Sequence, residues 1–386
     1  MLGRGLGDTY VVFVLPLEHE YGWTRSQLTS VYSIYLLMHG FTSPLVGLVF
    51  DRVGPRWVYA GGLACMCAAF FLAASLSNLW QFYLLVGGVV GIGVSLTGMV
   101  PGSALIARWY RERLATAIGI AFSAAGVGTI IFVPLAQQLV GDHGWRFAYR
   151  VLAGTLLLAL PFVAFWIPWK RYYAGHPERA HAAKLQAGEE GWTLRKAMGT
   201  RLYWGLCQVF FFTATAMFTV IVQLVAFFVD VGFSPLTAAS AYGVLGLMSA
   251  ASVMGSGLTS DRFGYRQTVT ATFVGTGAGM AILFMLSYGP SPLLLALFVP
   301  IFGLCMGVRG PIVSSISTRY FAGPNVATIY GTIYASNAIG AAFGSLMGGL
   351  LHDLTGGYRA GLVMAMACLL FASTPFWTVP VLRNFR

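Results

Sequence analysis

The chain has 386 residues, of which 57% are hydrophobic and only 9% are charged, and its mean hydropathy is +0.74. A soluble domain carries about a quarter charged residues because water must solvate its surface, so this composition excludes an ordinary soluble protein and indicates a membrane protein. The formal charge of +11 does not indicate nucleic-acid binding, because the basic residues lie in short turns between apolar runs rather than in one patch.

Apolar runs of about 20 residues predict transmembrane helices, and their lack of period-two alternation excludes a β-barrel. The sequence predicts six helices, a polar segment and six further helices. The first set is Leu2–Leu17, Leu28–Phe50, Trp57–Ser77, Leu79–Ala107, Leu114–Val140 and Phe147–Trp169. The second set is Leu202–Val229, Pro235–Ser260, Thr268–Tyr288, Pro292–Ser317, Val326–Leu351 and Tyr358–Leu382. Because the first run is short, we expect that helix to be truncated.

This order predicts an all-α membrane protein with 12 transmembrane helices in two six-helix bundles, residues 1–169 and 202–386. A linker over residues 170–201 joins them, and in it Thr193 is predicted to cap a short helix, Leu194–Thr200. An equal number of spans gives both halves the same orientation, hence a pseudo-two-fold axis along the membrane normal.

One charged turn occurs twice, after the second and after the eighth predicted helix. Gly47–Arg56 and Gly257–Arg266 share an Asp-Arg-x-Gly-x-Arg pattern, and their matching residues are 210 positions apart. Glycine accepts a positive φ and proline cannot continue a helix, so Gly54-Pro55 is expected to reverse the chain. The repeat indicates an internally duplicated membrane protein.

Basic residues are distributed unequally between the two sides of the predicted bundle. The turns after even-numbered helices, the linker and the tail carry 17 Lys and Arg residues, and the opposite side carries 4. Positive charge is retained in the cytoplasm, so the sequence predicts that both termini and the linker are cytoplasmic.

The repeated turn carries a family resemblance. The pattern Gly-x-x-x-Asp-Arg-x-Gly-x-Arg resembles the loop signature of the major facilitator superfamily. Arg108–Gly119, Ser123–Gly128 and Glu20–Arg25 resemble monocarboxylate transporters and oxalate/formate antiporters. Two departures stand beside this. The eighth predicted helix, where animal monocarboxylate transporters place an arginine, has no charged residue, and the eleventh lacks the lysine of oxalate/formate antiporters.

The resemblance implies that helices one, four, seven and ten line a central cavity. Apart from helix ends, the only charged residues within predicted helices are Arg4, Asp8 and Arg309, on the first and the tenth. A charge inside a membrane helix is costly and usually faces a cavity or a partner. Arg309 is interpreted as binding an anion, the alternative being a structural ion pair, for example to Asp8. Arg4 is assigned to substrate and Asp8 to a transported proton, or the two residues neutralise each other four positions apart.

Further polar residues are candidates for the cavity, although ordinary packing competes with each. The substrate-contact candidates are Tyr35, Gln223, Tyr242, Tyr334 and Asn337, and His39 is a candidate proton carrier. The resemblance also places Asp51 near the N-terminus of the eleventh helix, whose dipole favours a carboxylate. We interpret the following residues as a cytoplasmic gate: Asp51, Arg52, Arg56, Arg108, Asp261, Arg262 and Arg266.

The predicted function is secondary transport, by alternating access, of a small organic anion such as a monocarboxylate, with proton symport or exchange for a counter-anion. Export of larger or neutral compounds is an alternative. A membrane-embedded sensor or enzyme is an alternative from another class, but the longest polar segment is only Lys170–Arg201. We expect no catalytic residues, metal or cofactor, and a monomer in the cell inner membrane.

Overall fold

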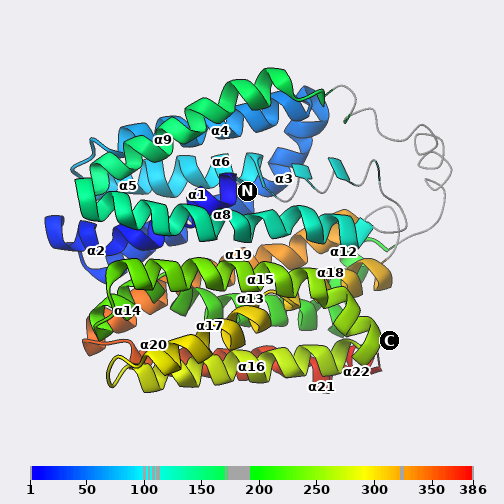
Figure 1. The fold of residues 1–386 in the computed structure, drawn as a ribbon. Coiled ribbons are helices and arrows are strands. Elements are labelled where there is room, and N and C mark those ends of the chain that lie inside the picture. The colour runs from blue at the N-terminus through cyan, green and yellow to red at the C-terminus, as the bar shows by residue number, and fades with distance from the viewer. Residues whose placement is uncertain are drawn as a thin grey trace.

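The computed structural model describes residues 2–98, 114–169, 192–321 and 326–384, and six single positions: 101, 102, 105, 106, 109 and 172. These residues form helices joined by short turns (Figure 1). The first half, blue to green-cyan in Figure 1, comprises α1 (Leu2–Gly7), α2 (Tyr10–Tyr21), α3 (Arg25–Val53), α4 (Pro55–Ala73), α5 (Leu79–Phe82), η1 (Tyr83–Val89), α6 (Val90–Leu96), α8 (Leu114–His143), α9 (Trp145–Pro161) and η2 (Phe162–Trp166).

The second half begins with a short helix, α12 (Leu194–Met198), whose first turn is capped by Thr193 as predicted. The longer helices of this half are α13 (Arg201–Ile221), α14 (Leu224–Val231), α15 (Pro235–Phe263), α16 (Tyr265–Leu286), α17 (Pro292–Met306), α18 (Arg309–Tyr320), α19 (Val326–Thr355) and α20 (Arg359–Ser373). Two short segments, α21 (Pro375–Thr378) and α22 (Pro380–Asn384), follow. Each half contains most of one large apolar cluster of buried side chains.

Nine helical segments of the described residues are long and apolar enough to cross a membrane. The segments outside that group are α1–α2, α3 and α19, at the places of the first, second and eleventh predicted helices. The all-α membrane architecture is therefore confirmed, whereas the count of 12 spans stays a prediction.

Among the predicted helices that are interrupted, the tenth, the first and the seventh bear most on the site. Proline has no backbone N–H and its ring clashes with the carbonyl four residues earlier, so Pro311 accounts for the break between α17 and α18. The first helix breaks between α1 and α2, where the Thr9 hydroxyl donates a 2.7 Å hydrogen bond to the Leu6 carbonyl instead of continuing the helix. The seventh breaks before α14, with Gln223 at φ −102° and ψ 3°.

The duplicated turns have the same backbone conformation. Gly54 has φ 84° and ψ 165°, and Gly264 has φ 80° and ψ 156°. Among the described residues, the positive-φ positions are six glycines: Gly22, Gly54, Gly144, Gly232, Gly264 and Gly356. They form three pairs, one member in each half, separated by 210, 210 and 212 residues. The predicted internal repeat thus appears in the backbone at these chain reversals.

The two halves pack against each other mainly through two helix pairs, α3 with α19 and α8 with α15. In Figure 1 the first half lies above the second, and α8, α19 and α15 lie at the boundary between the two halves. A Cβ added at Gly126 of α8 would lie 2.5 Å from the carbonyl oxygen of Gly246 in α15, so this contact requires glycine. We call the end that contains Gly54 and Gly264 the linker end, and the opposite end, with Gly144 and Gly356, the distal end.

Candidate functional site

An ion pair lies at the break between α1 and α2. The Nε of Arg4 is 3.1 Å from the Oδ1 of Asp8, as expected for residues four positions apart. The hydroxyl of Thr129, on α8, donates a 3.1 Å hydrogen bond to the other carboxylate oxygen. Interrupted helices commonly hold ligand sites in transporters, because their backbone and side chains reach into the space between bundles. Both predicted charges of the first helix therefore meet in one place.

Tyrosines from both halves surround this pair. The guanidinium of Arg4 lies within electrostatic range of Tyr32 and Tyr35 of α3 and of Tyr334 of α19. Tyr242 of α15 interacts electrostatically with Asp8 and with Arg4. The rings of Tyr32 and Tyr35 are 4.9 Å apart between centroids. The cluster thus lies where the two halves meet.

Accessibility differs across the ion pair. The Arg4 side chain is 38% exposed, whereas that of Asp8 is 12% exposed. The hydroxyl oxygen of Tyr35 is buried and has no hydrogen-bond partner in the part of the chain that the structure describes. An accessible guanidinium beside an unpartnered phenol offers donors that match a carboxylate, since a guanidinium presents a planar fork of N–H groups. The arrangement can bind a small anion and hold a proton on Asp8.

Two further predicted residues lie on the same helices. His39 follows Tyr35 by one helical turn, with ring centroids 6.4 Å apart, and interacts electrostatically with Arg4. Asn337 of α19 is partly buried, one residue before Ala338, which faces Gly40 of α3. Both therefore lie along the α3–α19 contact.

Arg309 is separate from this cluster. It is 1% exposed, and its Nη2 donates to the hydroxyl of Thr276 on α16, at 3.1 Å, and to the sulfur of Met217 on α13, at 3.7 Å. Its Nε and Nη1 have no hydrogen-bond partner among the described residues, and its Cζ lies 4.8 Å from the ring centroid of Phe273. Asp8 pairs with Arg4, so the alternative Arg309–Asp8 ion pair does not form here.

Gln223 also lies apart from the tyrosine cluster around Arg4 and Asp8. It is 3% exposed, and its Oε1 has no hydrogen-bond partner. A small cavity beside it is lined by Thr219, Gly348, Tyr358 and other residues of the second half, near the distal end. Gln223 therefore lies under the distal end rather than in the tyrosine cluster.

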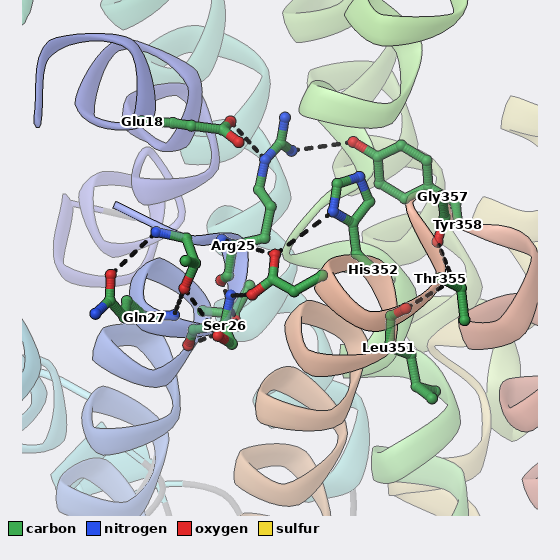
Figure 2. Close-up of polar contacts among 12 residues, drawn as sticks. Glu18, Arg25, Ser26, Gln27, Leu351, His352, Thr355, Gly357 and Tyr358 are labelled. Atoms are coloured by element: carbon green, nitrogen blue, oxygen red, sulfur yellow. Dashed lines mark hydrogen bonds and ion pairs between the residues drawn. The ribbon is translucent and has the colours of Figure 1, made fainter. Parts of the chain in front are cut away.

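The distal end holds a polar network that sequence reasoning did not identify (Figure 2). Its hub is Arg25, at the start of α3, with only 4% of its side chain exposed. The Nε of Arg25 is 2.5 Å from a carboxylate oxygen of Glu18, on α2. Its other two nitrogens reach the second half, with Nη2 3.0 Å from Asp230 and Nη1 donating to the hydroxyl of Tyr358 at 3.0 Å.

A carboxylate from the second half also caps α3. Asp353, at the end of α19, accepts hydrogen bonds from the backbone N–H groups of Arg25, at 3.1 Å, and Ser26, at 2.8 Å. Thr24 caps the N–H of Gln27 within the same turn. The first N–H groups of a helix lack intrahelical partners and attract negative charge. We call Arg25, Glu18, Asp230, Tyr358 and Asp353 the distal latch, because their contacts join the two halves.

The distal latch is expected to hold over the physiological pH range. Asp353 lies beyond the predicted span Val326–Leu351. Burial alone would raise the pKa of its carboxyl group. The hydrogen bonds from Ser26 and Arg25 outweigh burial, so the pKa is lowered. Stability from a lowered carboxyl pKa is fully present above about pH 4 and is lost as pH falls through the lowered value. The distance between spin labels at Asp142 and Leu354 should thus be unchanged from pH 8 to pH 5. A widening over that range would contradict this assignment.

The predicted gate residues at the linker end are only partly described. Arg108 and the side chains of Asp51 and Asp261 lie outside the described residues. Arg52 and Arg262 are exposed, and Arg56 and Arg266 are half-buried against aromatic rings. The gate at this end therefore stays a prediction.

Comparison with known proteins identifies the family. A family model described as Major Facilitator Superfamily matches residues 1–299 and 204–383. The chain belongs to the major facilitator superfamily. As a member of that superfamily it is a membrane transporter. Family membership therefore favours the transport hypothesis over the sensor and enzyme alternatives.

Several relatives of this major facilitator transporter are similar over nearly its whole length. Monocarboxylate transporter 13 of Rattus norvegicus is 26% identical over 389 residues, covering 98% of this chain and 84% of the relative. Monocarboxylate transporter 12 of Mus musculus is 24% identical over 401 residues, covering 97% and 82%. The uncharacterized MFS-type transporter YcxA of Bacillus subtilis is 24% identical over 383 residues, covering 94% and 88%. The resemblance seen in the sequence to the monocarboxylate branch is thereby supported.

Proposed function

We propose that this transporter moves a small organic anion of the monocarboxylate class across the cell inner membrane by alternating access. The observation that carries the proposal is the Arg4–Asp8 pair: an accessible guanidinium and a carboxylate at the junction of the halves, among tyrosines from both. The names of relatives such as monocarboxylate transporter 13 point to the same substrate class.

Coupling to a proton follows from the chemistry of the pair. Arg4 binds the substrate carboxylate in the fork of its guanidinium, and in doing so gives up its contact with Asp8. A carboxylate with 12% of its side chain exposed and without a cation is costly, so Asp8 takes up a proton. Binding of anion and proton would thus occur together. Exchange for a counter-anion remains the alternative if Asp8 stays ionised.

The distal latch is proposed to close one side of the transporter during alternating access. Its contacts join α3 to α14 and α19, while Glu18 of α2 pairs with Arg25, and together they hold the distal end closed. In the proposed cycle these contacts break when the halves rock, and the gate around Asp51 closes the linker end instead. The excess of basic residues on the linker side places that end, both termini and residues 170–201 in the cytoplasm. One chain is proposed to suffice as the working unit.

Transport by reconstituted vesicles tests this proposal. Proteoliposomes with an inward proton gradient should accumulate labelled small monocarboxylates, and a protonophore should abolish the accumulation if a proton is coupled. Exchange against an internal carboxylate without any gradient would indicate the counter-anion alternative. If neither assay moves a carboxylate while larger neutral compounds are exported, the alternative of an exporter replaces the proposal.

Arg309 is proposed as a second anion-binding residue, used in a conformation other than the one described. A buried guanidinium with two unpartnered donors is costly and gains from any anion that reaches it. Arg309→Met should therefore leave melting of the empty protein unchanged or higher, and reduce the thermal shift produced by substrate. Arg309→Lys is the matched variant that keeps the charge and should lose less. A wild-type thermal shift in Arg309→Met would show that Arg309 is scaffolding.

A further inference from the structure

Two arginines at the linker end lie in equivalent places in the two halves. Arg56 is in the first turn of α4, two residues after Gly54, and Arg266 is in the first turn of α16, two residues after Gly264. Because the two glycines share one backbone conformation, the turns project these arginines in the same way. They are predicted parts of the gate, and their contacts support a further role beside it.

Each arginine lies on an aromatic ring from the last membrane helix of its own half. The Cζ of Arg56 is 4.9 Å from the ring centroid of Phe165 in η2 and 5.0 Å from that of Trp57. The Cζ of Arg266 is 3.8 Å from the ring centroid of Trp377 in α21. Phe165 and Trp377 are 212 positions apart, the spacing of the last glycine pair. The same arginine–aromatic site is therefore built twice.

The guanidinium groups of both sites lack an acidic partner among the described residues. No carboxylate oxygen of those residues forms an ion pair with Arg56 or Arg266. The Nε of Arg56 is buried and finds no hydrogen-bond partner within the described ranges. The aromatic rings beside them are largely exposed, 72% for Phe165 and 50% for Trp377. A cation with free donors on an exposed ring matches the boundary between lipid tails and headgroups, where aromatic residues gather.

We propose that Arg56 and Arg266 form two equivalent binding sites for the phosphate of an anionic phospholipid. The guanidinium fork supplies two parallel N–H donors to phosphate oxygens, and the ring below it packs against the first part of the acyl chains. Basic residues next to a membrane helix are drawn to an anionic leaflet. Both lipids would sit beside the duplicated turns, one on each half.

Arginines at the distal end serve as matched controls. Arg146 also lies on a ring, 4.3 Å from the centroid of Trp145, but it pairs with Glu20 at 2.5 Å. Arg359 lies 4.1 Å from the ring centroid of Tyr288 and donates to the hydroxyl of Ser287 at 3.1 Å. These donors are already satisfied within the protein. Stacking on an aromatic ring alone therefore does not distinguish Arg56 and Arg266 from the distal arginines; the lack of a polar side-chain partner among the described residues does.

The test uses the purified full chain in mild detergent. Phosphatidylglycerol, phosphatidylcholine or inorganic phosphate is added, retained lipids are counted by native mass spectrometry, and melting is followed. The variants are Arg56→Gln, Arg266→Gln, the double variant and Arg146→Gln as control. None of these residues belongs to the Arg4 site, so the outcome does not depend on which substrate is transported.

The wild type should retain two phosphatidylglycerol molecules more tightly than phosphatidylcholine and should melt at a higher temperature with the former. Each single linker-end variant should lose one retained lipid, with affinity reduced roughly fivefold per arginine. Arg146→Gln should retain both. Equal retention in the double variant and the wild type would overturn the proposal. A stabilisation by inorganic phosphate equal to that by phosphatidylglycerol would also overturn it, because the site would then bind free phosphate.

Discussion

Arg4→Gln is expected to abolish concentrative transport while the protein still inserts and folds. The substitution removes the only accessible guanidinium of the tyrosine cluster among the described residues and leaves Asp8 without its cation. Loss of a charge-assisted hydrogen bond typically costs about 1.5–3 kcal/mol, roughly 10- to 150-fold in substrate affinity. Uptake of labelled monocarboxylate into proteoliposomes, with binding followed by thermal shift, measures both effects.

Variants of the partner residue separate binding from coupling. Asp8→Asn should keep exchange of substrate between the two sides but lose accumulation driven by a proton gradient. Arg150→Gln, an exposed arginine of the same half, is the control and should transport normally. If the pair only neutralises itself, the double variant Arg4→Gln/Asp8→Asn should recover wild-type transport. That recovery would remove Arg4 and Asp8 from the proposed mechanism.

Arg25→Gln is expected to open the distal end. The variant breaks the contacts of Arg25 with Glu18, Asp230 and Tyr358 together. Removing one member of a buried ion pair costs about 3–5 kcal/mol. Because the Asp230 side chain is 36% exposed and solvent screens it, we expect Arg25→Gln to destabilise the closed distal end by about 2 kcal/mol. The ratio of closed to open molecules should therefore fall roughly 30-fold.

Spin labels at Asp142 and Leu354, which lie in opposite halves at the distal end, report this ratio by their distance distribution. Arg25→Gln should add a population at longer distance. The matched control is Arg146→Gln, because Arg146 pairs with Glu20 at the same end but within the first half. An identical distance distribution in Arg25→Gln and in the wild type would show that the contacts of Arg25 do not keep the distal end closed.

Local features of this fold were predictable because their causes are local. Gly54 and Gly264 mark turns through the φ that only glycine adopts easily, and Thr193 marks a helix start through its hydroxyl. The spacing of Arg4 and Asp8 already allowed their ion pair. The helix interruptions were harder to predict from sequence. Pro311 explains the break between α17 and α18, but the break at Gln223 has no proline at the junction and depends on packing.

The distal latch was missed because it depends on which helices are neighbours. In the sequence, Arg25 is one of the few basic residues on the distal side and Asp353 follows the eleventh predicted helix, and neither position indicates a contact between them. One signal was available. If Asp51, at the end of the second predicted helix, lies near the start of the eleventh, then two helices running in opposite directions must also meet at their other ends. Arg25 and Asp353 are at those ends.

The paired glycines also show where the second half is longer than the first. The separation is 210 residues up to the pair Gly54 and Gly264, and 212 at Gly144 and Gly356. In sequence, Pro101 and Pro311 are still 210 apart, but Ala115 and Ala327 are 212 apart. The second half is thus two residues longer than the first between Pro311 and Ala327, a stretch containing the connection between α18 and α19. Within a helix, two residues would rotate every later side chain by about 200°, so only a connection can absorb them without turning α19 away from α3.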